Sequence, residues 1–144
     1  DLNAPYGIAL NSTDTDLFIA SLGVNDPLGP RGVLKLVLST DVVTVYQVYK
    51  SGNDLFLNNP TSIVFDSKSS TNLYVGNSIA SNIVRVTLEG FADNVTVTGV
   101  VLDAPTGFAY DDSDNLYLVN YNNNTLCKLT FTDTLTATGG ICEY

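Results

Sequence analysis

The stretch NLYVGNSIASNIVRV at residues 72–86 decides the fold, because it returns at residues 115–129 as NLYLVNYNNNTLCKL. Both copies have the same spacing of apolar residues, and each has a basic residue one place before its end, Arg85 and Lys128. Apolar runs with an alternating pattern predict strands, and the polar run in the middle of each copy predicts a turn. The stretch is therefore a β-hairpin that the chain uses more than once.

Two further strands flank each hairpin, and the whole unit occurs three times. A strand that begins with proline precedes the hairpin at residues 5–10, 60–65 and 105–110, and a Thr-rich strand follows it at residues 42–48, 94–98 and 134–138. The first hairpin has its strands at residues 17–20 and 33–36, with Lys35 in the position of Arg85 and Lys128. A chance likeness among the short strands of a sandwich is the alternative to a true repeat.

We predict an all-β fold of three four-stranded antiparallel blades, a partial or half β-propeller. The predicted blades cover residues 5–52, 60–98 and 105–139, residues 140–144 form a tail, and residues 1–144 make one domain. The pattern P-x-G-[IF]-A, then LYV, then N-x-x-β-β-[KR]-β resembles the NHL-repeat and SMP-30-like family of β-propellers. This resemblance implies a fold rather than a function, because propellers include binding proteins, scaffolds and hydrolases.

Composition excludes several classes of function. The net charge is −9, with 15 acidic and six basic residues, so nucleic acid and anionic membrane surfaces would repel the chain. No apolar run is long enough for membrane insertion. The absence of histidine excludes Ser-His-Asp and Cys-His catalysis, and no phosphate-binding glycine loop occurs. We therefore predict no catalytic, cofactor-binding or metal-binding residues.

Two segments offer weak alternatives to that prediction. The acidic run that starts at Asp111 resembles a calcium loop, but it lacks the glycine and glutamate that an EF-hand needs at its sixth and twelfth places, which favours a turn. The SMP-30-like resemblance implies a metal-dependent lactonase-like hydrolase, with Asn77 and Asn120 as conceivable metal ligands. Glu89 and Glu143 lie at a strand end and in the tail, and half a propeller has no closed channel, so this activity stays the alternative.

The basic residues and the longest loop each have two interpretations. Lys35, Arg85 and Lys128 lie opposite the aliphatic face of their strands, where we expect them to reach water or a nearby aspartate; a basic row that binds a ligand is the alternative. Residues 21–32 form a loop that is longer than the other hairpin turns. This loop is either a recognition loop or a tolerated insertion.

The cysteines and sequons bear on the compartment. Cys127 and Cys142 either form a disulfide or remain two buried thiols, and two cysteines without histidine do not make a zinc site. Asn11, Asn94 and Asn123 begin N-glycosylation sequons at positions that we expect to be accessible. We predict an extracellular or cell-surface protein.

The two ends of the chain occupy the same position within the repeat. Leu2, Leu57 and Leu102 each stand three residues before a repeat proline, and Cys142 occupies the corresponding place at the end of the third repeat. Three blades do not close a ring, since propellers take roughly four to eight. Each end would therefore expose an apolar blade face.

These features lead to a prediction of a non-catalytic extracellular module. We expect it to associate with further copies of itself, head to tail, as a ring or a filament, or to present a recognition surface for a protein or glycan ligand. A fragment of a longer propeller and a monomer with capped ends are the alternatives.

Overall fold

A computed structural model describes residues 4–21, 32–40, 42–46 and 57–143. These residues contain strands and turns but no helix, and hence no helix that is long and apolar enough to cross a membrane. The strands are β1 (Pro5–Leu10), β2 (Asp16–Ser21), β3 (Gly32–Val37), β4 (Val42–Tyr46), β5 (Pro60–Phe65), β6 (Asn72–Asn77), β7 (Asn82–Thr87), β8 (Ala92–Asn94), β9 (Thr96–Thr98), β10 (Pro105–Tyr110), β11 (Asn115–Asn120), β12 (Thr125–Asp133) and β13 (Thr136–Glu143).

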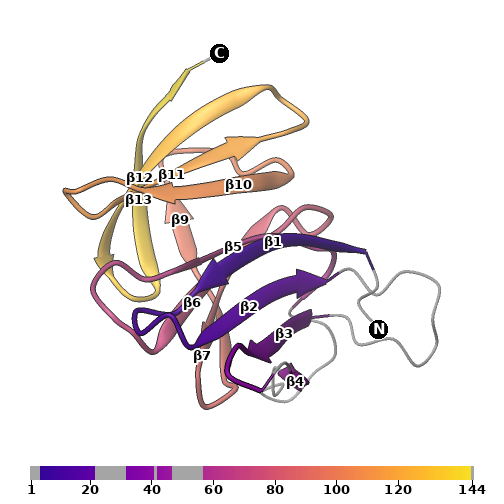
Figure 1. Ribbon diagram of the computed structural model, residues 1–144. Helices are drawn as coiled ribbons and strands as arrows, with labels where there is room; N and C mark the ends of the chain where they lie inside the picture. Colours follow the sequence, from indigo (N-terminus) through magenta and orange to yellow (C-terminus); the bar gives the residue numbers. More distant parts are fainter. Residues whose placement is uncertain (1–3, 22–31, 41, 47–56, 144) are drawn as a thin grey trace.

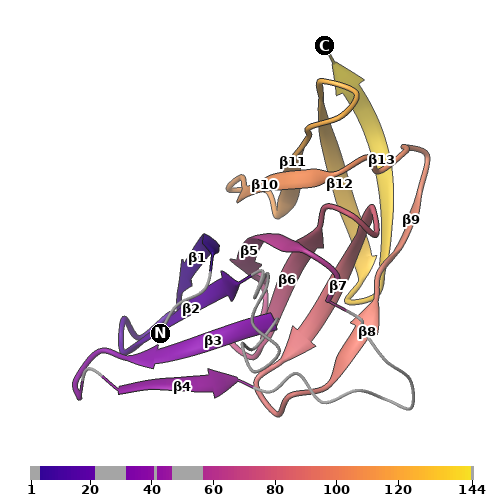
Figure 2. The same ribbon diagram turned by 90° about the vertical axis from the view of Figure 1, so that its right-hand side faces the viewer.

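The strands form three sheets that follow one another along the chain. Blade 1 has the order β1-β2-β3-β4, blade 2 has β5-β6-β7-β8, and blade 3 has β10-β11-β12-β13 with β9 added at its edge. Neighbouring strands are antiparallel except for the β9–β13 pair. The first strands of the blades contact each other in chain order, β1 with β5 and β5 with β10, while the later strands spread apart (Figures 1 and 2). The predicted all-β blade architecture is confirmed.

The turn between the first two strands of a blade is built from asparagine and aspartate. The Asn11 Oδ1 accepts hydrogen bonds from the backbone N–H groups of Thr15 in the turn and of Asp16, the first residue of β2, at 2.9 and 3.1 Å. The Asp111 carboxylate does the same before β11, where it accepts from the N–H groups of Ser113 and Asn115, each at 2.9 Å. Asp14 and Asp114 adopt left-handed φ angles of 54° and 62° inside these turns, a conformation that aspartate tolerates better than most residues.

Each core lies between two blades. We call the surface of a blade that faces the next blade in the chain its forward face, and the opposite surface its rear face. The forward face of blade 1 packs on the rear face of blade 2, and the forward face of blade 2 packs on the rear face of blade 3. The first core contains Phe18, Ala20 and Val33 against Leu73, Val75, Val84 and Val86; the second contains Tyr74 and Ile83 against Leu116, Leu118, Cys127 and Leu129.

The last strand of blade 2 differs from the prediction. We expected one strand over residues 94–98, but the chain divides there: β8 ends blade 2, and β9 joins blade 3 in parallel with β13. The division falls at Val95, whose N–H donates to the Ile83 carbonyl of blade 2 at 2.9 Å, while the N–H of Thr96 donates to the Leu135 carbonyl of blade 3 at 2.7 Å. The buried Val95 side chain belongs to the core between the two blades, so the strand crosses from one sheet to the next.

The end of the chain also differs from the prediction. We expected residues 140–144 to form a tail, but residues 140–143 continue β13, which starts at Thr136 rather than at residue 134. The strand extends because Cys142 stands opposite Cys127 on β12. In the first blade, Ser21 and Gly32 border the long loop, whose residues 22–31 lie outside the described residues, as do residues 47–48 of the predicted fourth strand.

Candidate functional site

The interface between blades 2 and 3 shows what a completed contact requires. The Tyr74 side chain is 1% exposed, its ring packs on Phe131 with centroids 4.6 Å apart, and its hydroxyl donates to the Thr134 carbonyl at 3.0 Å. Burial, followed by the nearby Asp66 carboxylate, raises the pKa of the Tyr74 phenol above its usual range. The tyrosine therefore stays neutral and acts as a hydrogen-bonding anchor of the blade contact.

Arg85 joins the same two blades from the outer part of the interface. Its Nη2 lies 2.6 Å from the Asp93 carboxylate, and its Nη1 donates to the Thr134 Oγ1 at 2.9 Å. The aliphatic face of β7 packs between blades as predicted, and the face that carries Arg85 is also packed, because Ile83 beside it is fully buried. Both faces of the middle blade are therefore used in contacts.

The other two basic residues of the predicted row have local partners. The Lys35 ammonium lies 2.9 Å from the Asp16 carboxylate, and the Lys128 ammonium lies 5.7 Å from the centroid of the Tyr117 ring. The Lys35 ion pair agrees with the predicted contact to a nearby aspartate, whereas the Lys128 ammonium lies over an aromatic ring instead.

The innermost strands meet through small residues and a threonine. The Thr61 hydroxyl on β5 donates to the Pro105 carbonyl on β10 at 2.9 Å. Gly7 on β1 lies so close to the backbone of β5 that a Cβ atom at this position would be 2.9 Å from the Thr61 carbonyl oxygen. The contact between consecutive inner strands thus depends on a hydrogen bond to the proline carbonyl and on close backbone approach.

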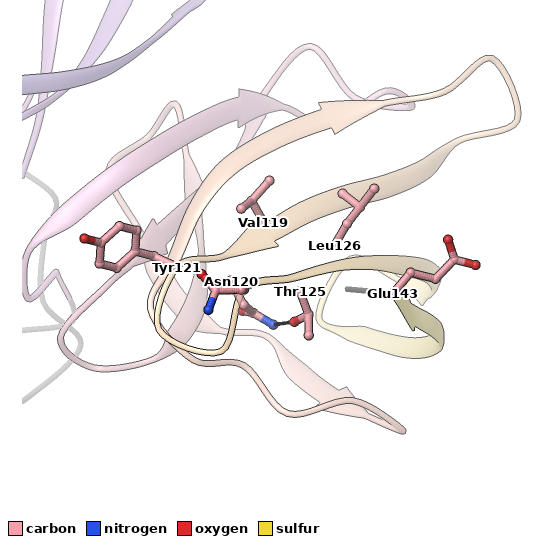
Figure 3. A pocket seen from close by; sticks show the side chains of 7 residues that line it. Val119, Asn120, Tyr121, Thr125, Leu126 and Glu143 are labelled. Atoms are coloured by element: carbon pink, nitrogen blue, oxygen red, sulfur yellow. Dashed lines mark hydrogen bonds between the residues drawn. The ribbon is translucent and has the colours of Figure 1, made fainter.

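The forward face of blade 3 carries the same positions without a covering blade. Val119 and Leu126 are paired across β11 and β12, and their side chains are 45% and 47% exposed. Their equivalents in blade 2 are Gly76 and Ile83, which are buried. Figure 3 shows both side chains pointing to the same side of the sheet, beside a cavity of about 510 Å³ that Glu143 also lines.

The rear face of blade 1 is open along its inner strand. Ile8 and Leu10 on β1 are 64% and 43% exposed. Their equivalents on β5 and β10 pack into the inter-blade cores, at Ile63 and Phe65 and at Phe108 and Tyr110. Pro5 is exposed, whereas the equivalent prolines of blades 2 and 3 are buried. On the next two strands, Ile19 and Leu34 are buried.

A groove lies where the inner strands begin, and we call it the axial groove. It has a volume of about 630 Å³. Asn59 and Ala104, which precede the prolines of blades 2 and 3, line it with left-handed φ angles of 65° and 52°. The Asn59 and Ala104 carbonyls accept hydrogen bonds from Ser78 and Tyr121 of the neighbouring turns, at 3.1 and 3.0 Å. Such backbone strain persists where surrounding contacts hold it, and here the turns do so.

Asn77 and Asn120, the candidate metal ligands that the family resemblance implied, have structural roles. Both are fully buried at the ends of β6 and β11. The Asn120 amide donates to the Val101 carbonyl at 3.1 Å and to the Thr125 hydroxyl at 3.2 Å, and its oxygen accepts from the Asp103 N–H at 3.0 Å. The Asn77 amide donates to Asn82 at 2.9 Å. Within the described part of the chain, no group of three acidic, histidine or cysteine side chains could hold a metal ion.

Asp111 is occupied by its own turn. Besides the two backbone hydrogen bonds, its carboxylate accepts from the Asn115 amide at 2.9 and 3.1 Å. These hydrogen bonds, with the Asn115 backbone N–H first, lower the pKa of the Asp111 carboxyl. The turn predicted from the sequence is therefore what the acidic run forms.

The three sequons differ in their surroundings. The Asn11 amide nitrogen donates two hydrogen bonds inside its own turn, at 3.1 and 3.2 Å. Asn94 is exposed at the end of β8, and its oxygen accepts from the Asn82 amide at 2.7 Å, which leaves its nitrogen facing outward from that contact. The Asn123 oxygen accepts from the Thr125 hydroxyl at 2.7 Å. Neither the Asn94 nor the Asn123 nitrogen donates a hydrogen bond to a described residue, and Asn94 is the more exposed of the two, so it is the sequon most open to modification.

The two cysteines form a disulfide. Cys127 and Cys142 are directly opposite each other on β12 and β13, with Cα atoms 4.1 Å apart. Cys127 is fully buried in the core between blades 2 and 3, so the bond joins the last strand to that core. Of the two alternatives that the sequence left open, the structure contains the bridge.

Solved structures with similar folds are β-propeller proteins. An auxiliary nutrient binding protein from Bacteroides thetaiotaomicron gives a TM-score of 0.73 at 15% identity, over 98% of this chain and 32% of that one. A candidate gluconolactonase gives 0.71 at 13% identity, over 94% of this chain and 48% of that one. An inactive virginiamycin B lyase from Staphylococcus aureus, solved with quinupristin, gives 0.63 at 18% identity, over 94% and 40%.

These likenesses establish the propeller fold and no more, because the identities are low. The chain spans between about a third and a half of the length of these proteins. No protein-family profile and no curated protein sequence matches it. The predicted propeller is thus confirmed, whereas the resemblance to NHL repeats in particular stays a prediction.

Sequence reasoning missed the axial groove and the residues of the open faces. The groove depends on turns from different blades that come together only in space. The signal for the open faces was present in the repeat itself, since Val119 and Leu126 align with buried positions of blade 2.

Proposed function

We propose that this chain is a non-catalytic β-propeller-type building block that joins a second copy head to tail. The forward face of blade 3 in one copy would receive the rear face of blade 1 in the next. The observation that carries the proposal is the exposure of Val119, Leu126, Ile8 and Leu10 at positions whose equivalents are buried or packed against the cores between blades. Apolar surface of this kind gains free energy when a partner removes it from water.

The internal interfaces serve as the template for the contact. In it, the Thr106 hydroxyl would donate to the Pro5 carbonyl of the second copy, as Thr61 donates to Pro105 within the chain. Gly107, which aligns with Gly7, has nothing but Val119 of its own blade near its missing Cβ, so room remains for a neighbouring inner strand. Two chains would make six blades, which lies within the roughly four to eight of closed propellers. A rotation that does not close would give a filament.

The non-catalytic part of the proposal is supported by the side chains. The chain has no histidine, and the amides of Asn77 and Asn120 are engaged in hydrogen bonds within their own blades. We further propose an extracellular or cell-surface location. A disulfide and an exposed sequon at Asn94 support it, because disulfides persist in oxidising compartments.

Light scattering during gel filtration at micromolar concentration tests the assembly. We expect the wild-type chain to elute at twice its monomer mass or a higher multiple, and we expect Leu126→Arg to elute as a folded monomer. Phe91→Arg is the matched control, because Phe91 is 61% exposed in the turn between β7 and β8 of the middle blade, which carries neither open face. It should keep the wild-type mass.

Two outcomes would overturn the proposal. One is a folded wild-type chain that stays monomeric, which would favour blades supplied by a longer chain. The other is an assembly that Leu126→Arg leaves intact, which would place the contact elsewhere.

A further inference from the structure

The axial groove lies within a single chain and meets the forward face of blade 3 at Tyr121, which also lines the cavity beside Val119 and Leu126. It is lined by residues of all three blades: Tyr6 from blade 1, side chains of the β5 start and the β6–β7 turn from blade 2, and Thr106 and the β11–β12 turn from blade 3. None of the ten lining residues is charged, although the chain carries 15 acidic and six basic residues. Its volume of about 630 Å³ lies within the range of roughly 300–1,000 Å³ that is typical of small-molecule sites.

Two aromatic rings stand in this groove with most of their surface in solvent. Tyr6 is 62% exposed and Tyr121 is 71% exposed. They come from the first and third blades, and blade 2 lies between these two blades (Figure 1). Large exposed tyrosines on separate blades around one hollow are a surface that can hold a flat or ring-shaped ligand.

The polar groups of the groove are amides and hydroxyls; Asn59, Thr61, Ser78 and Ser81 already donate within the protein, and others remain available to a ligand. Within the described residues, the hydroxyls of Tyr6 and Tyr121 make no hydrogen bond. The Asn122 amide donates to the Asp103 carboxylate at 2.9 Å, which turns its nitrogen to the protein and leaves its oxygen as an acceptor. The groove therefore offers neutral donors and acceptors beside aromatic faces.

We propose that the axial groove binds a short neutral oligosaccharide. The C–H groups on one side of a pyranose ring carry partial positive charge and suit the electron-rich face of a tyrosine ring. The hydroxyl groups of a sugar both donate and accept, as do the tyrosine and threonine hydroxyls that line the groove. The occupant is a neutral sugar rather than an anion, because the net charge of −9 and the absence of a basic lining residue disfavour anions.

Isothermal titration calorimetry of the full chain with neutral trisaccharides tests this proposal. The probes are cellotriose, triacetylchitotriose and mannotriose, with trigalacturonate as an anionic comparison and a neutral tripeptide as a non-sugar comparison. We expect at least one neutral trisaccharide to bind and trigalacturonate not to bind. Tyr121→Ala should weaken binding about tenfold, the effect of losing one stacking contact.

Phe91→Ala is the matched control. Phe91 is 61% exposed, but it lies in the turn between β7 and β8, at the other end of blade 2 from the groove. This variant should bind the sugar as the wild type does. The proposal fails if no neutral trisaccharide binds at millimolar concentration, if Tyr121→Ala leaves binding unchanged, or if the tripeptide binds in place of the sugars.

Discussion

The substitution Gly7→Ala examines the closest backbone approach between blades. A Cβ atom on Gly7 would lie 2.9 Å from the Thr61 carbonyl oxygen, 3.0 Å from the Ser62 Cα and 3.1 Å from the Ile63 nitrogen. All three are backbone atoms, and carbon atoms prefer separations of roughly 3.5–4.0 Å. The strands β1 and β5 would therefore have to move apart by about half an ångström.

The cost follows from two opposing effects. Overpacking of this kind costs about 1–3 kcal/mol, and the lower backbone entropy of alanine in the unfolded chain returns about 0.5–1 kcal/mol. We expect Gly7→Ala to lower the free energy of unfolding by roughly 1–2 kcal/mol. The melting temperature should fall by about 3 °C for each kcal/mol.

Gly107→Ala is the matched comparison, because Gly107 holds the equivalent position in blade 3. A Cβ there would lie 3.7 Å from the Val119 Cγ2, an ordinary contact. We expect this variant to be as stable as the wild type, or more stable by up to about 0.5–1 kcal/mol. The difference between the two glycines isolates the effect of a packed neighbouring strand.

Urea unfolding followed by circular dichroism measures both variants. The Leu126→Arg background removes the proposed association, so that differences in assembly do not enter the free energies. A Gly7→Ala protein that is as stable as its parent would refute the reasoning, as would equal destabilisation at Gly107.

Three further predictions concern the inter-blade contacts and the surface. Tyr74→Phe should lower the free energy of unfolding by about 1 kcal/mol through loss of the hydroxyl hydrogen bond, whereas Tyr117→Phe should change it by less than about 0.5 kcal/mol. Equal effects in urea unfolding would contradict the role given to the Tyr74 hydroxyl. Replacing Cys127 and Cys142 together by alanine should cost about 3 kcal/mol, given a sequence separation of 15 residues. An unchanged unfolding midpoint would exclude this stabilisation. When a eukaryotic host secretes the chain, Asn94→Gln should remove more glycan mass than removal of either other sequon; mass spectrometry showing an unmodified Asn94 would contradict this ranking.

The blade pattern could be predicted because it is local and repeated. Residues 72–86 and 115–129 carry the alternation of apolar residues that specifies a strand, and the prolines mark where each inner strand starts. The predicted turn at Asp111 was also correct, since a side chain that accepts hydrogen bonds from the residues just after it needs no distant partner.

The boundaries that were wrong depend on distant partners. Val95 lies between two sheets, so the chain passes from blade 2 to blade 3 at this residue, although the local pattern of residues 94–98 predicts one strand. The last strand reaches Glu143 because Cys142 meets Cys127 across the sheet. Neither pairing is visible in the local pattern.

The same difference between local patterns and distant contacts applies to the candidate sites. Repeat alignment identified Asn77, Asn120 and the basic row as equivalent positions, but their roles came from their partners, such as the Thr125 hydroxyl that accepts from Asn120. The axial groove has no counterpart in the sequence pattern, because Tyr6 and Tyr121 are separated by most of the chain.

The sequence alone determined the strand content, the number of repeats and the positions that face a neighbouring blade, because these depend on alternation along the chain and on spacing between copies. Only the tertiary structure decided which of those positions are covered. Ile83 is buried and Leu126 is half exposed, although they hold equivalent places in their repeats. The physical reason is that burial belongs to the pair of surfaces in contact, and a residue meets its partner surface only once the blades are arranged in space.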